Sequence, residues 1–136
     1  MKLEAYVYDP ESEESLRIYN QILSWDEDAF PPGELLPKLG VLTRDESGEI
    51  LCYVCADMSN SIPRAMVDYL MTNPDISPTK RYKAVKLAEE FICKRLKELG
   101  YTYIIGVSRH AGVAALSQSL GYEVLLKPVI EFNKVI

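Results

Sequence analysis

A run of basic residues, Thr79-Lys80-Arg81-Tyr82-Lys83, stands at the start of a long amphipathic segment that closes at Leu99-Gly100. The apolar residues of this segment recur with helical spacing. The first N–H groups of a helix have no partner inside the helix, and together with the helix dipole they attract phosphate. Lysine and arginine side chains add direct charge pairing. These residues therefore indicate an anion site at one helix start, and a solvated helix face is the alternative.

An aspartate and a histidine are the other candidates for chemistry. Asp68 lies in an apolar strand predicted over Arg64–Thr72, and it is the only acid on its face of that strand. Strand alternation places four residues on this face: Met66, Asp68, Leu70 and Thr72. His110 is the only histidine, and an imidazole transfers protons near neutral pH. A lone histidine at a strand-to-helix junction is more often a cap or a surface residue.

The three cysteines do not indicate a disulfide framework or a metal site. Cys52 and Cys55 match the pattern C-x-x-C, but they lie in a strand-like run, where residues three apart point to opposite faces. No second cysteine or histidine pair completes a zinc site. We therefore expect small apolar strand residues and no bound metal.

Composition and length fit one ordinary globular domain, residues 1–136, with 48% apolar and 26% charged residues. No apolar run approaches the roughly 20 residues that span a bilayer. The N-terminus lacks the basic-then-apolar pattern of a signal peptide. The expectation is a cytoplasmic protein that is not in a membrane.

Charge is distributed unevenly along the chain. Residues 1–50 carry 12 acids and 4 bases, whereas residues 51–136 carry 8 acids and 11 bases. The net charge of −5 argues against general nucleic-acid binding, which needs a broad basic face.

Periodicity and turn residues predict the order β-α-α-β-β-β-α-β-α-β-β. Its first helix is predicted to start at Asp9-Pro10, with an acid-rich first turn. The fold class is α/β, with a mixed, largely antiparallel central sheet and helices on both faces. The remaining predicted elements are a strand over Leu3–Tyr8, a short helical turn within Asp26–Gly40, a hairpin of Gly40–Thr43 and Glu49–Asp57, a strand over Tyr101–Val107, a helix ending at Leu120-Gly121-Tyr122, and final strands over Glu123–Lys127 and Val129–Val135.

This order resembles the GNAT superfamily of acyl-CoA-dependent N-acyltransferases. By topology the resemblance covers nearly the whole chain, but the matching sequence motifs are confined to residues 66–122. These motifs are Leu70-Met71-Thr72-Asn73-Pro74-Asp75, Lys80-Arg81-Tyr82-Lys83-Ala84-Val85, Leu99-Gly100 and Leu120-Gly121-Tyr122.

The resemblance implies acetyl-CoA as cosubstrate and a primary amine, on a small molecule or a protein, as acceptor. By position, the strand end would pair with the pantetheine arm and the loop Thr79–Val85 would hold the pyrophosphate. Asp68 would be the general base, and Ser117 falls where the family has its general-acid tyrosine. The positions implied for the cofactor are Leu70, Met71, Thr72, Lys80, Arg81, Tyr82, Lys83, Ala84, Val85 and His110, the last where the family has asparagine.

The sequence also departs from the family pattern. Lys83 and Val85 replace the two glycines of the phosphate loop, and glycine is what permits close approach of backbone to phosphate. Serine has neither the reach nor the acidity of a phenol. Two functions therefore stay open: an N-acetyltransferase, or a catalytically inactive GNAT-fold binding or structural protein such as a phage component. In the first case the acidic runs Glu11–Glu14 and Asp26–Asp28 could steer a cationic acceptor; a homodimer is also left open.

Overall fold

The computed structural model describes residues 2–107, 111–125 and 132–136. Their core element is a five-stranded sheet with the strand order β1-β2-β3-β4-β5. The pairs β1–β2, β2–β3 and β3–β4 are antiparallel, and β5 runs parallel to β4. The elements are β1 (Leu3–Val7), α1 (Ser15–Trp25), the 3₁₀ helix η1 (Gly33–Leu35), β2 (Leu39–Asp45), β3 (Ile50–Met58), β4 (Arg64–Thr72), α2 (Pro78–Glu98), β5 (Tyr103–Gly106) and α3 (Ala111–Ser119).

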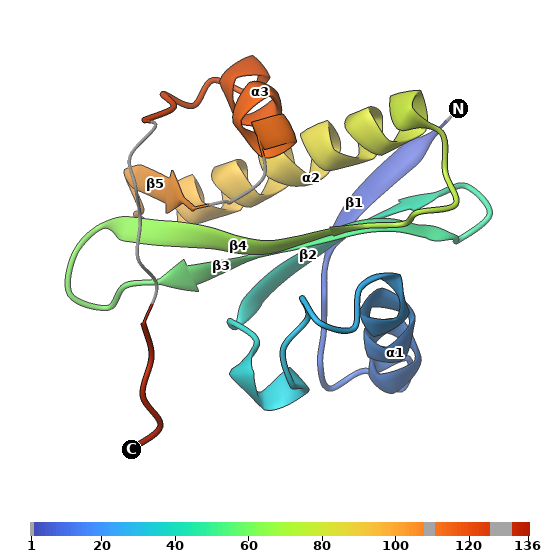
Figure 1. Cartoon of the computed structure of the whole chain (residues 1–136), viewed down its shortest axis with the longest axis horizontal. Coiled ribbons are helices and arrows are strands. Elements are labelled where there is room, and N and C mark those ends of the chain that lie inside the picture. Colours follow the sequence, from blue (N-terminus) through green and yellow to red (C-terminus); the bar gives the residue numbers. More distant parts are fainter. Residues whose placement is uncertain (1, 108–110, 126–131) are drawn as a thin grey trace.

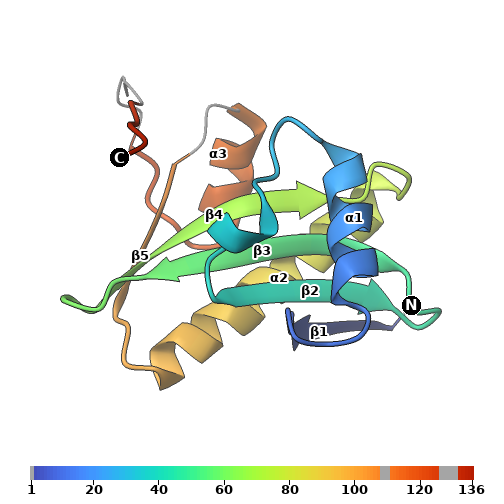
Figure 2. The ribbon, with the colours of Figure 1, turned by 90° about the horizontal axis from the view of Figure 1, so that it is seen from below.

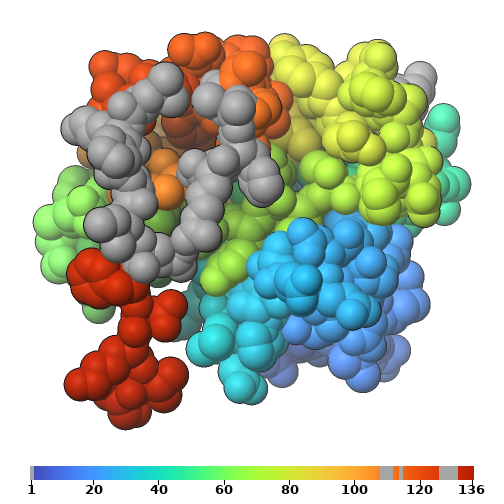
Figure 3. Space-filling view, viewed as in Figure 1, coloured from blue at the N-terminus to red at the C-terminus, as the bar shows by residue number. Residues whose placement is uncertain are grey.

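Helices cover both faces of this sheet (Figure 1). α1 and η1 lie on one face, and α2 and α3 lie on the other, as the view turned by 90° also shows (Figure 2). In the space-filling view the N-terminal residues, in blue, and the α2 residues, in yellow, are on opposite sides of the molecule (Figure 3). The expected α/β class, with a mixed and largely antiparallel sheet, is confirmed.

Two apolar clusters, one on each face, hold the layers together. On one face Ala84, Ala88, Ile92 and Leu96 of α2 are buried at every fourth residue and pack on the sheet. This is the helical stripe that the sequence predicts. The other cluster joins the buried residues of α1 and Phe30 to Leu42, Tyr53 and Met71 of the sheet. No helix in the described part of the chain is long and apolar enough to cross a bilayer.

The first helix begins later than the sequence predicts. α1 starts at Ser15 rather than at Pro10. The Asp9 carboxylate does satisfy a backbone donor, but it accepts from the Glu11 N–H at 2.9 Å and so closes a turn two residues long. Aspartate competes for local backbone donors in this way, and the same signal therefore serves a turn or a helix cap.

The predicted element order is longer than the observed one. The final strands expected over Glu123–Lys127 and Val129–Val135 include residues 126–131, which lie outside the described part of the chain. On either side of that gap, residues 122–125 and 132–136 are not in a strand. The final strand pair stays a prediction.

Candidate functional site

β4 and β5 separate halfway along the sheet. β5 pairs with β4 only from Arg64↔Tyr103 to Val67↔Gly106, and β4 then continues to Thr72. The β4–β3 register also shifts at this point, because Cys55 pairs with Asp68 whereas Tyr53 pairs with Met71. β4 thus has a bulge where its second neighbour, β5, ends. Beyond that point β4 still pairs with β3 on one side, but no described strand pairs with it on the other.

The bulge puts one residue into an unusual backbone conformation. Tyr69 has φ +51°, the only positive φ of a non-glycine residue in the described chain. This conformation costs about 1–2 kcal/mol for an L-residue. The peptide between Asp68 and Tyr69 is held at both ends. Its N–H donates to the Asp68 carboxylate at 2.8 Å, and its carbonyl accepts from the Cys55 thiol at 3.3 Å.

The bulge overturns the predicted sharing of one face by Met66, Asp68, Leu70 and Thr72. Asp68 lies opposite Cys55, on the face covered by α1, and Met66 shares that face. Thr72 lies opposite Cys52, on the face covered by α2. The extra residue at the bulge interrupts the alternation of two, so residues before and after it change faces. Asp68 itself is exposed, and Leu70 is also at the surface.

The predicted phosphate loop Thr79–Val85 is not a loop, because α2 already begins at Pro78. Ser77 is its N-cap, and its hydroxyl accepts from the Lys80 N–H at 3.2 Å. A serine cap followed by proline is a known helix-start signal, and it could have been found in the sequence. Ala84 and Val85 are buried against the sheet. Their side chains therefore pack α2 against the sheet and are not exposed at the start of the helix.

Two of the basic side chains at the helix start are already engaged. Lys80 Nζ lies 2.8 Å from Asp45 Oδ2, with side chains only 23% and 10% exposed. Hydrogen bonds from Lys80 first and then from the Ser47 hydroxyl hold the pKa of Asp45 well below its usual value. Arg81 donates to the carbonyls of Pro74 and Ile76 at 3.5 and 3.3 Å. Its Nε is buried without a hydrogen-bond partner among the described residues.

Among the residues of this helix start that the sequence predicts as cofactor contacts, Tyr82 and Lys83 are exposed. These two residues lie near the end of β4, because hydrogen bonds of Asn73 hold the loop between β4 and α2. The Asn73 amide donates to Glu49 and to the Ile50 carbonyl, both at 3.1 Å, and its oxygen accepts from the Asp75 N–H at 2.9 Å. The edge of β4 and the start of α2 are thereby placed at the same end of the molecule.

Two further residues that the sequence predicts for the site are Ser117 and His110. Ser117 is half-buried in α3, where its carbonyl accepts from Leu120 and Tyr122 and closes the helix. His110 lies outside the described residues.

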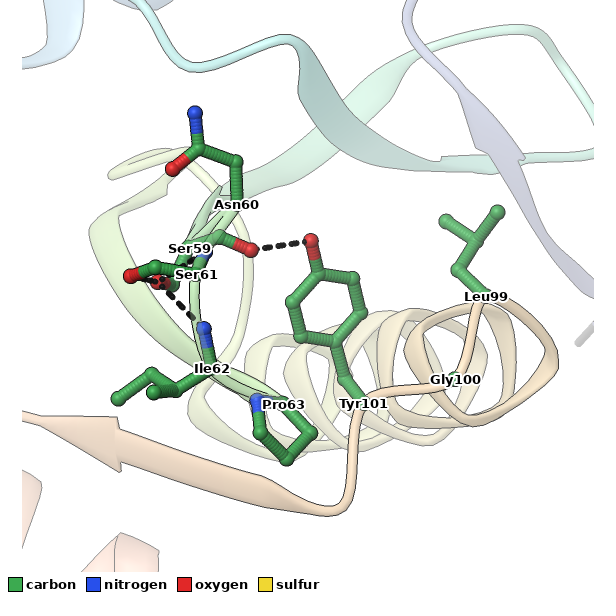
Figure 4. A pocket seen from close by; sticks show the side chains of 8 residues that line it. All are labelled: Ser59, Asn60, Ser61, Ile62, Pro63, Leu99, Gly100 and Tyr101. Carbon is green, nitrogen blue, oxygen red and sulfur yellow. Dashed lines mark hydrogen bonds between the residues drawn. The ribbon is translucent and has the colours of Figure 1, made fainter.

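Two surface hollows of the described chain lie elsewhere. One is next to the opposite end of α2, where the Tyr101 hydroxyl donates to the Ser59 carbonyl at 2.7 Å (Figure 4). A second lies beside β5, where the Cys93 thiol donates to Glu89 at 2.8 Å. Burial raises the pKa of the Cys93 thiol to about 12, so it is not a reactive thiolate. The described residues contain no group of three or more histidines, cysteines or acids that could hold a metal ion.

Comparisons with known proteins agree with this architecture. No protein-family model and no curated protein sequence matches the chain. Among solved structures, an acetyltransferase from Trypanosoma brucei superposes with a TM-score of 0.66 at 10% identity, over 97% of this chain and 100% of the other. An aminoglycoside acetyltransferase from an uncultured soil metagenomic sample gives 0.63 at 16% identity, over 100% and 99%.

A third structure, a GNAT family N-acetyltransferase from Escherichia coli in complex with CoA, gives a TM-score of 0.63 at 14% identity, over 90% of this chain and 69% of the other. At these identities the likeness defines a fold. The chain has the GNAT fold, in a divergent sequence, as the resemblance implied.

Proposed function

We propose that this protein binds an acyl-CoA, with acetyl-CoA as the first candidate, and transfers the acyl group directly to a primary amine. The observation that carries the proposal is the bulged edge of β4 next to the start of α2, where no further described strand pairs with β4 on the β5 side. An extended ligand arm can pair with such an edge, as peptides do in β-augmentation. The similar structures include an enzyme bound to CoA, which supports this assignment.

The phosphates of the ligand would meet side chains rather than backbone. Pro78 has no N–H, and the Lys80 N–H is taken by Ser77, so the first turn of α2 offers few free donors. Lys83 is exposed, and the Arg81 side chain is half-buried, with its Nη2 donating to two backbone carbonyls. Cations of this kind pair directly with phosphate. The chain therefore fits the group through charge, in place of the glycines that the family uses.

In the proposed reaction the amine nitrogen attacks the thioester carbonyl, the C–N bond forms and the C–S bond breaks. Asp68, exposed beside the bulge, is the proposed acceptor of the amine proton. The leaving group is a thiolate, and thiols have a pKa of about 8.5, so expulsion at neutral pH needs little help from an acid. Ser117 in place of a tyrosine is compatible with turnover for this reason. The main contributions are proximity and electrostatic stabilisation.

The second candidate is a GNAT-fold protein that binds a partner and transfers nothing. The observation that favours it is the occupied helix start. Ser77 caps α2 from within the chain, and Asp45 neutralises Lys80, which are two tasks that a bound phosphate would otherwise perform.

Thermal unfolding with and without acetyl-CoA separates the two candidates. Ligand at about 100 times its Kd stabilises the folded state by about 2.7 kcal/mol. We expect a rise in Tm, and release of the CoA thiol when an amine is added. Lys83→Ala should weaken binding, whereas Lys86→Ala, an exposed lysine further along α2, should not. An unchanged Tm of the folded protein at millimolar acetyl-CoA would rule out the transferase.

A further inference from the structure

The two cysteines of the C-x-x-C pattern serve opposite faces of the sheet. Both are fully buried, on one strand, three residues apart. Cys52 points toward α2, where its thiol lies 3.3 Å from the Thr43 hydroxyl and 3.4 Å from the Ala84 carbonyl. Cys55 points toward α1 and donates to the Asp68 carbonyl at 3.3 Å. The two cysteines of the pattern thus make different contacts, and only Cys55 contacts the bulge of β4.

The thiol of Cys55 has one available role, that of a hydrogen-bond donor. Burial raises its pKa to about 12, so the thiol keeps its proton at neutral pH. Being fully buried, it cannot reach a substrate, which excludes an acyl-cysteine intermediate at this residue. The Tyr53 ring closes the space beside it, because Gly40, the cross-strand partner of Cys55, has no Cβ. A Cβ there would lie 2.9 Å from a Tyr53 ring carbon.

The target of this donor is the one strained peptide of the site. Tyr69 is held at φ +51°, and its N–H is bound by the Asp68 side chain. Cys55 is the group from a neighbouring strand that fixes the other end of the same peptide. A peptide whose N–H and carbonyl are both hydrogen-bonded keeps one orientation. Without these two hydrogen bonds, the bulge would relax toward ordinary strand geometry.

We propose that Cys55 is a positioning residue: its thiol holds the Asp68–Tyr69 peptide in the bulged orientation, and so sets the edge of β4 and the Asp68 carboxylate for acyl transfer. The inference rests on the proposed function for its catalytic consequence. Its structural part, a bulge held by Cys55, stands without that function. A small misplacement of reacting groups is costly, since errors of about 1 Å can reduce rates by about 10²-fold.

Three variants test the proposal: Cys55→Ala, Cys55→Ser and, as matched control, Cys52→Ala. Both alanine variants remove one buried thiol from the same strand and should lower Tm to a similar extent. We expect Cys55→Ala to reduce kcat by about tenfold or more, with a smaller change in the KM for acetyl-CoA. Cys52→Ala should keep kcat within about twofold, because the Cys52 thiol bonds to Thr43 of β2 and Ala84 of α2 and not to the bulge. Cys55→Ser keeps a donor and should recover most of kcat.

A second readout does not need activity. Exchange of the Tyr69 amide proton in the free protein should speed up several-fold in Cys55→Ala and stay unchanged in Cys52→Ala. Equal effects of the two alanine variants on exchange would overturn the proposal. Faster exchange in Cys55→Ala with no acetyl-CoA binding by the wild-type protein would retain the positioning of the bulge and refute the transferase instead. Altered exchange with unchanged kcat would refute the catalytic consequence.

Discussion

Asp45 and Asp68 are two aspartates of the sheet, one at the end of β2 and one within β4, and their surroundings differ. Asp45 is the cross-strand anchor of the β2–β3 turn: it accepts from the Ser47 and Glu49 backbone and pairs with Lys80 at 2.8 Å. All of its contacts stabilise the ionised form. Asp68 accepts a hydrogen bond from the Tyr69 backbone N–H and is exposed. The first carboxylate is bound within the fold, whereas the second is exposed to solvent beside the bulge.

Asp45→Asn should destabilise the protein in a pH-dependent way. The folded-state pKa of Asp45 is lowered, chiefly by Lys80. Its contribution to stability is therefore complete above the unfolded-state pKa of about 4 and is lost as the pH falls through the folded-state value. The Tm difference between wild type and variant should be full at neutral pH and shrink below a pH of about 4. Glu46→Gln, at an exposed neighbour, is the control; a constant difference down to acid pH would contradict the assignment.

Asp68→Asn should remove the proposed base while keeping the side-chain shape. Loss of general base catalysis lowers kcat by about 10²–10⁴-fold. The carboxamide can still accept from the Tyr69 N–H, so Tm should change little. Asp57→Asn is the matched control, because Asp57 is an exposed acid on the same face, two residues along β3 from Cys55. Equal kcat values of the two variants would remove Asp68 from the mechanism.

At the level of elements, the packing of β2 against β3 depends on the large side chain of Tyr53. Tyr53 is 1% exposed and packs edge-on against Tyr8 and Phe30, with ring centroids 6.2 and 5.4 Å away. Its ring extends over Gly40 on the adjacent strand, and its hydroxyl has no hydrogen-bond partner among the described residues. Burial raises the pKa of this phenol far above its usual value. The glycine is required by side-chain volume, since its φ is not in the left-handed region.

Gly40→Ala should therefore destabilise the fold. The new Cβ would lie 2.9 Å from Tyr53 Cε2 and 3.0 Å from its hydroxyl oxygen. Overpacking of a buried site costs about 1–3 kcal/mol, measurable by urea unfolding. Gly112→Ala is the contrasting variant, because a Cβ there meets nothing within 4 Å and the residue is helical. It should stabilise by about 0.5–1 kcal/mol. Equal stabilities of the two variants would show that the Tyr53 ring can move aside.

The elements that periodicity specifies were predictable, and those that depend on strand pairing were not. β4 spans Arg64–Thr72, the range predicted from its apolar run, and the stripe of α2 is buried as expected. The bulge depends on how Tyr53 and Cys55 of the neighbouring strand pair, which no local pattern in β4 encodes. The Asp45–Lys80 pair joins residues 35 apart in sequence. A basic residue that the sequence indicates as a phosphate ligand can instead form an ion pair within the protein, with a residue that is distant in sequence and close only in the fold.

At the scale of the whole molecule, the described sheet ends at β5. This strand pairs with β4 on one side, and its Tyr103 side chain is 61% exposed. The sequence predicts two further strands, over Glu123–Lys127 and Val129–Val135. A sheet edge with exposed apolar residues invites pairing with another strand. The outer edge of β5 is the place in the described sheet that such strands would occupy.

Amide exchange of β5 decides whether the sheet continues. Successive N–H groups of a strand point to alternate sides, so β4 alone can protect only alternate amides of Tyr103–Gly106. If the C-terminal strands pair with β5, all of these amides should exchange slowly in the full chain. In a chain shortened to end at Leu125, alternate amides should then become fast while the β3–β4 amides stay protected. Fast alternate amides in the full chain would mean that β5 is an edge in solution, and the predicted final strands would have to be abandoned or placed elsewhere.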